Sequence, residues 1–185
     1  VVMFDKGYSR HKSAGPPHGW EYWRVSVDAH HPTGRLMGEP RPDDRMALLG
    51  LEMKPWRDIG KRILIAGSSA KYHAFYGLSD PTTYARKVVR RLRGLTNLPI
   101  TYRPKPSWRE AVPIPGTTFS TQSVESIDEA LCGAHVLITH GSNACFEAVL
   151  AGVPCIVLGD AVARPISSTD LEDVERPHLA SDDER

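Results

Sequence analysis

The sequence predicts an α/β fold, with a Rossmann-like parallel sheet, helices on both of its faces and a small irregular, partly β N-terminal region. Residues 62–66 (RILIA) form a continuous apolar run, which is typical of a central parallel strand covered on both faces. Residues 136–139 (VLIT) and 155–158 (CIVL) are two more runs of this kind. Helical segments with capping residues alternate with these strands, and this alternation predicts right-handed crossovers in a parallel sheet.

The first part of the chain, residues 1–58, is expected to form an irregular region of its own. Two strands are predicted there because β-branched and aromatic residues are frequent, over residues 1–5 and 22–28. Glycines and prolines predict a loop over residues 9–20 and an irregular crossover over residues 31–44. Asp43 or Asp44 is expected to cap a short helix that ends at Leu49.

Residues 61–185 are assigned to a single Rossmann-like domain, because the pattern becomes regular from there. The predicted strands are residues 62–66, 99–102, 117–120, 136–139 and 155–158. The predicted helices are residues 81–93, 126–132 and 144–151, with one or two further helical turns over residues 171–174. Asp80 precedes a first-turn Pro81, and Ser126 with Glu129 forms a capping box, so two of the helix starts are marked by known signals.

Composition excludes some classes of protein. The chain has 185 residues, a formal net charge of +1 and 41% hydrophobic residues, which is ordinary for a globular protein and gives no global reason to bind nucleic acid or a membrane. Neither a signal peptide nor an apolar run near the roughly 20 residues of a membrane span is visible. Three cysteines without metal-like spacing favour a reduced, cytoplasmic setting. Because the chain opens inside a strand without an initiator methionine, we expect either a fragment or a protein trimmed at one or both ends, in which a missing segment could hold half of the active site.

The strongest chemical signal is the turn His140-Gly141-Ser142-Asn143, between a predicted strand and a predicted helix. The free N–H groups of a helix start and the helix dipole favour an anion there. Ser142 or Asn143 can cap the helix and bind a phosphate, and Glu147, one turn later, can accept hydrogen bonds from a ribose diol. An ordinary capped turn is the alternative. We favour ligand binding, because open α/β sheets bind ligands at the carboxyl ends of their strands.

Two further segments follow strands and are expected at the same edge of the sheet. Gly67, Ser68 and Ser69 follow residues 62–66, and their spacing matches neither a Walker loop nor a dinucleotide fingerprint. They form either a plain turn or the second wall of one pocket. Arg103 and Lys105 lie in the proline-stiffened segment RPKP, which either grips a phosphate or is a solvated loop.

The predicted helix over residues 81–93 is basic on one face. Its cationic residues are Arg86, Lys87, Arg90, Arg91 and Arg93. We favour a solvated face, and the alternative is contact with a polyanion such as DNA.

The N-terminal region offers candidates for a general base. Asp5 ends the first predicted strand, and His30 and His31 follow the second. Adjacent histidines in an extended chain point in opposite directions, so a metal site shared by them is not expected. A structural role is the more common one for a single histidine.

Four segments together resemble the C-terminal, nucleotide-sugar-binding half of GT-B glycosyltransferases. They are ILIAGSS, YRPKP, SVESIDEAL and HVLITHGSNACFEAVLAGVPCIVLGDA, within about residues 61–170. The likeness is to the capsular-polysaccharide type, which includes bacterial Kdo transferases, and to glycosyltransferase-like proteins of phages. The resemblance implies that Ser142 and Asn143 bind nucleotide phosphates and that Glu147 contacts ribose. In relatives that use CMP-sugars a basic, proline-containing segment also meets the phosphate, which maps to Arg103 and Lys105.

The resemblance implies transfer of a sugar from a CMP- or UDP-linked donor to an acceptor hydroxyl, on a carbohydrate or a modified DNA base. No metal and no cofactor besides this donor substrate are expected, and Asp5, His30 or His31 would deprotonate the acceptor. One alternative is a UDP-sugar epimerase, and another is a non-catalytic phage or structural module that binds a polyanion through the basic helix. Residues 1–58 are too few for the complete second domain of a GT-B enzyme. Either the chain is truncated, or the acceptor half is supplied otherwise, or activity has been lost.

Overall fold

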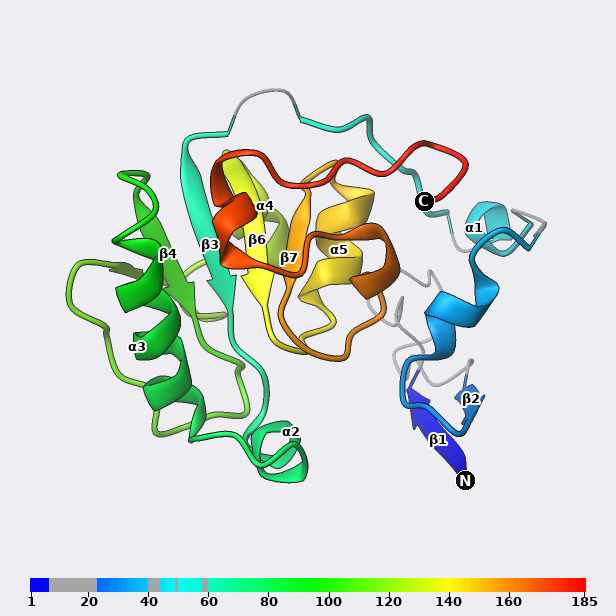
Figure 1. Ribbon diagram of the computed structural model, residues 1–185, viewed down its shortest axis with the longest axis horizontal. Helices are drawn as coiled ribbons and strands as arrows, with labels where there is room; N and C mark the ends of the chain where they lie inside the picture. The colour runs from blue at the N-terminus through cyan, green and yellow to red at the C-terminus, as the bar shows by residue number, and fades with distance from the viewer. Residues whose placement is uncertain (7–22, 40–43, 49, 58–59) are drawn as a thin grey trace.

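A five-stranded parallel sheet forms the body of the protein, and a two-stranded antiparallel sheet lies to one side of it (Figure 1). The structure is a computed structural model that describes residues 1–6, 23–39, 44–48, 50–57 and 60–185. The predicted loop over residues 9–20 and the candidate cap Asp43 lie outside the described residues. The predicted α/β class, with a parallel sheet covered on both faces and a small partly β N-terminal region, is confirmed.

The elements follow the order expected from the sequence. The strands are β1 (Val2–Lys6), β2 (Trp23–Val27), β3 (Arg62–Ala66), β4 (Ile100–Arg103), β5 (Thr118–Phe119), β6 (Ala134–Thr139) and β7 (Cys155–Val157). The α-helices are α1 (Asp44–Leu48), α2 (Ala70–Phe75), α3 (Pro81–Leu92), α4 (Ile127–Leu131) and α5 (Ala144–Leu150). Short 3-10 helices are η1 (Pro32–Leu36), η2 (Arg164–Ile166) and η3 (Leu171–Glu175). Every predicted strand is present, whereas α2, η1 and η2 were not predicted.

The capping signals act as the sequence predicts. The Asp80 carboxylate accepts a hydrogen bond from the backbone N–H of Thr83, and Pro81 occupies the first turn of α3. Ser126 and Glu129 form the complete capping box at the start of α4. The unpredicted helix α2 is capped by Ser69, whose hydroxyl accepts from the backbone N–H of Tyr72 at 3.2 Å.

The alternation of side chains along β3 builds two cores, one on each face of the sheet. Ile63 and Ile65 face the core that contains α3, whereas Leu64 and Ala66 face the core that contains α4 and α5. These residues are almost fully buried, since neither face of a central parallel strand meets solvent. Figure 1 shows α3 on one side of the sheet and α4 and α5 on the other.

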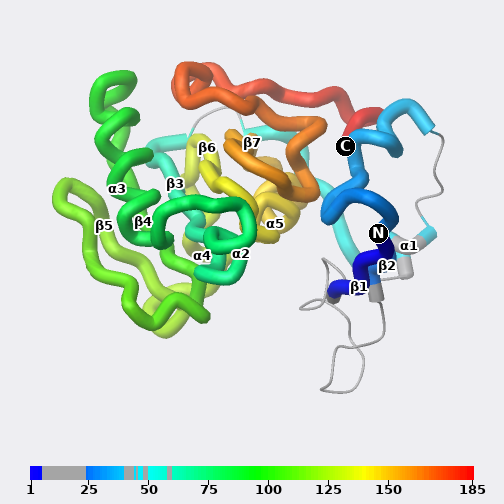
Figure 2. Tube along the Cα trace, turned by 60° about the horizontal axis from the view of Figure 1, so that its bottom comes forward, coloured from blue at the N-terminus to red at the C-terminus, as the bar shows by residue number. Residues whose placement is uncertain are grey.

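The order of the strands places a binding crevice next to β3. The sheet runs β5-β4-β3-β6-β7, so the chain moves outward from β3 to β5 and then returns to the opposite side of β3. Open α/β sheets bind ligands outside the carboxyl ends of the strands where the order reverses, which here is between β3 and β6. Figure 2 turns this edge toward the reader, with α2 in front of it.

The N-terminal hairpin presents different residues on its two faces. Phe4 pairs with Val25 and Val2 with Val27, and these apolar side chains are exposed. Asp5 pairs with Arg24, and their side chains form an ion pair at 2.8 Å. Within the described ranges, every helix is too short or too polar to span a bilayer.

The segment before β3 is fixed to the body of the protein. The backbone N–H of Lys54 donates to the carbonyl of Leu150, and the backbone N–H of Arg57 donates to the carbonyl of Gly152. The indole of Trp56 donates to the carbonyl of Ala180 at 2.6 Å. These bonds join residues 54–57 to the end of α5 and to the C-terminal segment.

Candidate functional site

A pocket of about 390 Å³ lies at the carboxyl ends of β3, β4 and β6. Its lining includes six of the residues predicted from the sequence, which are Gly67, Arg103, Lys105, Ser142, Asn143 and Glu147. The other lining residues include Gln122 and Ser126, which approach from the segment between β5 and α4. The volume falls within the range of small-molecule sites.

Hydrogen bonds between loops fix the turn after β6. The hydroxyl of Thr139 donates to the carbonyl of Ala66 at 2.8 Å and accepts from the backbone N–H of Ser142 at 3.0 Å. The hydroxyl of Ser68 accepts from the backbone N–H of Gly141 at 3.0 Å. The segments after β3 and β6 are therefore held together at one edge, as the sequence predicts.

The start of α5 uses Ser142 rather than Asn143 as its cap. The hydroxyl of Ser142 accepts from the backbone N–H of Ala144 at 3.3 Å, whereas the side chain of Asn143 makes no capping bond. Both residues line the pocket, with Ser142 buried and Asn143 half-buried. The Asn143 amide is therefore not committed to the helix that it precedes.

The three predicted residues after β3, Gly67, Ser68 and Ser69, have different roles. Gly67 lines the pocket, while Ser68 lies with His140 beside a smaller cavity and Ser69 caps α2. The backbone N–H of Gly67 donates to the carbonyl of Arg103 at 2.8 Å. A Cβ atom at position 67 would lie 3.2 Å from the backbone nitrogen of Lys105, so glycine permits the close approach of the cationic segment.

Arg103 and Lys105 supply the positive charge of the pocket. Strand β4 extends through Arg103, one residue further than predicted, and buries this side chain. Its guanidinium donates to the hydroxyl of Ser120 at 2.8 Å and to the carbonyl of Glu125 at 2.9 Å. Burial lowers the pKa of Arg103, and an arginine side chain nevertheless remains charged in proteins. Because a guanidinium has five N–H donors, Arg103 retains donors for a ligand.

Glu147 is a half-buried carboxylate within the first turn of α5. It lines the same pocket as the two cations. A carboxylate only accepts hydrogen bonds, so it suits hydroxyl donors such as those of a ribose and repels a phosphate. The pocket therefore contains both cationic groups and an acceptor that suits a diol.

A cluster of aromatic and polar side chains lies beside this pocket, and sequence reasoning missed most of it. The Tyr72 hydroxyl donates to the carbonyl of Asp160 at 2.8 Å and accepts from the Asp160 N–H at 3.1 Å. The Tyr76 hydroxyl donates to Oδ2 of Asp160 at 2.9 Å. Burial raises the pKa of Tyr72 and raises that of Tyr76 to about 12, so both hydroxyls keep their protons at neutral pH. The available signal for α2 was the spacing of Tyr72 and Tyr76, which lie four residues apart and therefore share one face of a helix.

His140 lies within the same cluster. Its Nδ1 is 2.7 Å from the hydroxyl of Tyr84 in α3, and its ring is adjacent to that of Tyr72. Burial, then His73 and Arg164, lowers the pKa of His140, which keeps the ring neutral at neutral pH. His140 is therefore a packing and hydrogen-bonding residue between α2 and α3.

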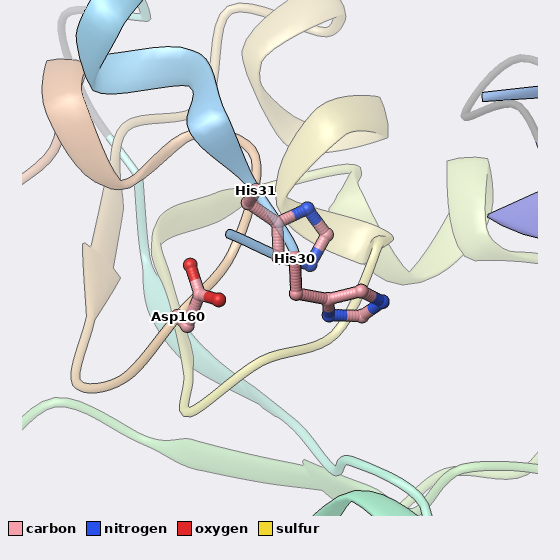
Figure 3. Close-up of side chains that lie close together, drawn as sticks. All are labelled: His30, His31 and Asp160. Carbon is pink, nitrogen blue, oxygen red and sulfur yellow. The ribbon is translucent and has the colours of Figure 1, made fainter. Parts of the chain in front are cut away.

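The two N-terminal histidines lie together, which corrects the expectation that they point in opposite directions. The chain bends after β2, where Asp28 has a φ of 61°, so His30 and His31 do not continue an extended strand. Their ring centroids are 4.3 Å apart. One nitrogen of each ring and one carboxylate oxygen of Asp160 all lie within 4.8 Å of one another (Figure 3).

Asp5 belongs to the same neighbourhood. Its Oδ2 accepts from the guanidinium of Arg24 at 2.8 Å and lies 3.3 Å from Nε2 of His30. The structure therefore brings the three predicted base candidates, Asp5, His30 and His31, to one place and adds Asp160 to them.

The basic face of α3 is partly used within the fold. Arg91 forms an ion pair with Glu172, and Arg93 donates to the carbonyls of Leu98 and Gly116. Arg86, Lys87 and Arg90 are exposed. Exposure of these three side chains is expected for a solvated face and equally for contact with a polyanion.

Comparison with solved structures shows a glycosyltransferase-like fold. The chain is similar to KpsC of Thermosulfurimonas dismutans, a β-Kdo 2,7-transferase, with a TM-score of 0.61, 16% identity and coverage of 100% of this chain and 66% of that chain. It is also similar to a β-Kdo 2,4-transferase of the same organism, likewise KpsC, with a TM-score of 0.56, 15% identity and coverage of 87% and 62%. The chain thus spans about two thirds of these GT-B structures. No family model matches the sequence, and no curated protein matches it.

Proposed function

We propose that the chain binds a nucleotide-activated sugar in the pocket between β3, β4 and β6 and transfers the sugar to an acceptor hydroxyl. One observation carries this proposal: residues from three separate strand ends line a single pocket that contains two cations, two small polar residues and one carboxylate. The cations and the small polar residues suit the phosphates of a donor, and the carboxylate suits a ribose diol. The similarity in fold to two Kdo transferases supports the same class of reaction.

Each residue of the pocket has a proposed role. Arg103 and Lys105 balance the charge of the donor phosphate, and Ser142 and Asn143 hydrogen-bond its oxygens. Glu147 accepts hydrogen bonds from the ribose of a CMP- or UDP-linked donor. When the bond between sugar and phosphate breaks, negative charge grows on the leaving phosphate, and fixed cations stabilise that charge without a metal ion.

The acceptor is a hydroxyl of a carbohydrate or of a modified DNA base. The candidate bases are Asp5, His30 and His31, which lie together near Asp160. Removing a proton from the acceptor as it attacks raises its nucleophilicity.

A thermal-shift panel with CMP, UDP, GDP and their sugars tests the donor site. A ligand that binds only the folded state stabilises it by about 2.7 kcal/mol at 100 times its Kd. We expect one nucleotide series to raise the melting temperature, and Ser142→Ala with Asn143→Ala to abolish the rise. Arg86→Ala is the control, because Arg86 is exposed on α3 and should leave the rise unchanged. A full response in the double variant would show that the donor binds elsewhere.

A further inference from the structure

Hydroxyl groups already occupy most backbone N–H groups of the turn between β6 and α5. The N–H of Gly141 donates to Oγ of Ser68 at 3.0 Å, and the N–H of Ser142 donates to Oγ1 of Thr139 at 3.0 Å. The N–H of Ala144 donates to Oγ of Ser142 at 3.3 Å. Each N–H carries a single proton, so these three groups have none left for a phosphate. The turn therefore offers fewer free donors than an uncapped helix start would.

Asn143 carries most of the donors that this turn retains. Its side chain makes no capping bond, is half-buried and lines the proposed donor pocket. In the part of the chain that the structure describes, neither its side-chain amide nor its backbone N–H forms a hydrogen bond within the protein. The side-chain amide supplies two N–H donors, and the backbone N–H supplies a third. Asn143 is therefore the residue of the turn that is best able to donate to phosphate oxygens.

Thr139 connects this turn to the neighbouring strand. Besides accepting from Ser142, its hydroxyl donates to the carbonyl of Ala66, the last residue of β3, at 2.8 Å. Thr139 is only 2% exposed, so water cannot readily replace either bond. One buried hydroxyl thus bridges the end of β3, the end of β6 and the turn that follows β6.

Ser68 holds the turn from the segment after β3. It is buried, and its hydroxyl bonds the N–H of Gly141. Gly141 and Ser142 directly precede Asn143, so the bonds to their two N–H groups fix the path of the chain into Asn143. Neither Ser68 nor Thr139 is among the described residues that line the proposed donor pocket. Both therefore influence a bound donor only through the turn.

We propose that Ser68 and Thr139 are positioning residues for donor binding, whose hydroxyls hold the turn in the shape that places Asn143 in the pocket. This inference rests on the proposed donor site. Ser68 then does not contact the ligand itself. Gly67 lines the pocket, and Ser68 supports the turn on the opposite strand end. The two serines and threonines that lie outside the pocket lining and bond this turn thereby acquire a role in affinity.

A turn with one populated shape binds its ligand more tightly than a turn with several. If only a fraction of the molecules holds the competent shape, the apparent Kd equals the intrinsic Kd divided by that fraction. Loss of a buried hydroxyl leaves the N–H that it bonded without an acceptor, and the turn can relieve this cost by moving that N–H toward water. The donor would then bind only those molecules in which Asn143 keeps its place.

The test measures the Kd of CMP and of UDP by isothermal titration calorimetry in the wild type, Ser68→Ala and Thr139→Val. We expect the nucleotide that binds the wild type to bind each variant about 3- to 10-fold more weakly, the range that corresponds to one hydrogen bond. Thr139→Ser keeps the hydroxyl and should restore the wild-type Kd. Thr117→Val is the matched control, because Thr117 also donates to a backbone carbonyl, that of Ile114, but lies outside the pocket lining.

A double-mutant cycle tests whether Thr139 acts through Asn143. In the Asn143→Ala background, Thr139→Val should change the Kd by less than about 2-fold. High nucleotide concentrations keep the weak binding of these variants measurable. Losses that add fully would show that Thr139 acts by another route and would overturn the inference.

The outcomes separate this inference from the proposed function. A wild type that binds neither CMP nor UDP would overturn the donor site and, with it, this inference. An unchanged Kd in a folded Ser68→Ala or Thr139→Val would overturn the positioning role and leave the donor site intact. An equal loss in Thr117→Val would show a general effect of stability and would overturn it too. Circular dichroism shows which variants are folded at the titration temperature, and if Thr139→Val is not, Ser68→Ala decides the result, because it leaves only one N–H without its acceptor.

Discussion

The ring of Tyr72 covers Gly141 so closely that a Cβ atom at Gly141 would lie 2.1 Å from Cζ of the tyrosine. Tyr72 has little freedom to move away, because its hydroxyl bonds the backbone of Asp160 twice. The glycine in the turn after β6 is therefore required by the side chain above it. This contact joins α2 to the turn that lines the proposed donor pocket.

Replacing Gly141 by alanine should destabilise the fold by about 1–3 kcal/mol, the usual cost of forcing an extra methyl group into a packed site. Urea denaturation measures this change. Gly94→Ala is the matched control, because the nearest atom to a Cβ there, the carbonyl oxygen of Arg91, is 3.4 Å away. Equal stability of the two variants would show that Tyr72 does not press on Gly141.

Replacing Glu147 by alanine should remove the discrimination between ribose and deoxyribose. If Glu147 accepts from the 2′-hydroxyl, the wild type should bind CMP or UDP about 10-fold more tightly than its 2′-deoxy form, since a hydrogen bond to a charged group contributes about 1.5 kcal/mol or more. Glu147→Ala should bind the two forms equally. Isothermal titration calorimetry measures both affinities. A discrimination that persists in Glu147→Ala would place the ribose elsewhere.

The stability of the fold should depend on pH through His31. Its pKa falls from 6.5 to about 4 on folding, so the unfolded chain takes up the proton more readily. The contribution of neutral His31 to the free energy of unfolding is complete above pH 6.5, and it is lost as the pH falls from 6.5 toward 4. In His31→Asn, whose carbonyl can accept from Arg24, the loss between about pH 7 and about pH 5 should be smaller. Denaturation midpoints at both pH values measure this, and equal losses would contradict a buried neutral His31.

Binding of DNA should not depend on the basic face of α3. Filter binding of a duplex at several salt concentrations compares the wild type with the triple variant Arg86→Ala, Lys87→Ala and Arg90→Ala. Arg93 is kept, because it bonds the carbonyls of Leu98 and Gly116 within the fold. We expect both proteins to retain the DNA on the filter weakly and to a similar extent. A steep salt slope that flattens in the variant would instead favour the polyanion-binding alternative.

The sequence predicted the elements of the sheet because their signals are local. The apolar run of β3 and the capping residues Asp80 and Ser126 each act within a few residues of their own position. Helix α2 was missed because it is a helix of six residues without a long apolar stripe. Its position depends on the contacts of Tyr72 and Tyr76 with Asp160, which join residues that are more than 80 positions apart.

The pocket proposed to bind the donor was predictable for a different reason. Parallel strands all end at the same edge of a sheet, so residues that follow them meet even when they are distant along the chain. Gly67, Lys105 and Ser142 could be grouped in this way. His30 and His31 could not, because their relation to Asp160 depends on a single backbone bend at Asp28. An aspartate is one of the residues that tolerate a positive φ, but Asp28 alone does not predict which residues the bend brings together.

The parallel order of the central sheet has a consequence for how the chain folds. Thr139 at the end of β6 bonds Ala66 at the end of β3, and these residues are 73 positions apart. Forming a contact between residues so far apart requires closure of a long loop. The entropy cost of this closure comes before the contact stabilises the chain, so proteins that depend on such contacts fold slowly. We expect refolding on a scale of milliseconds to seconds or longer. A chain that ends before β6 should keep the pairing of β3 with β4 but leave the other edge of β3 unpaired and exposed, and it should therefore aggregate.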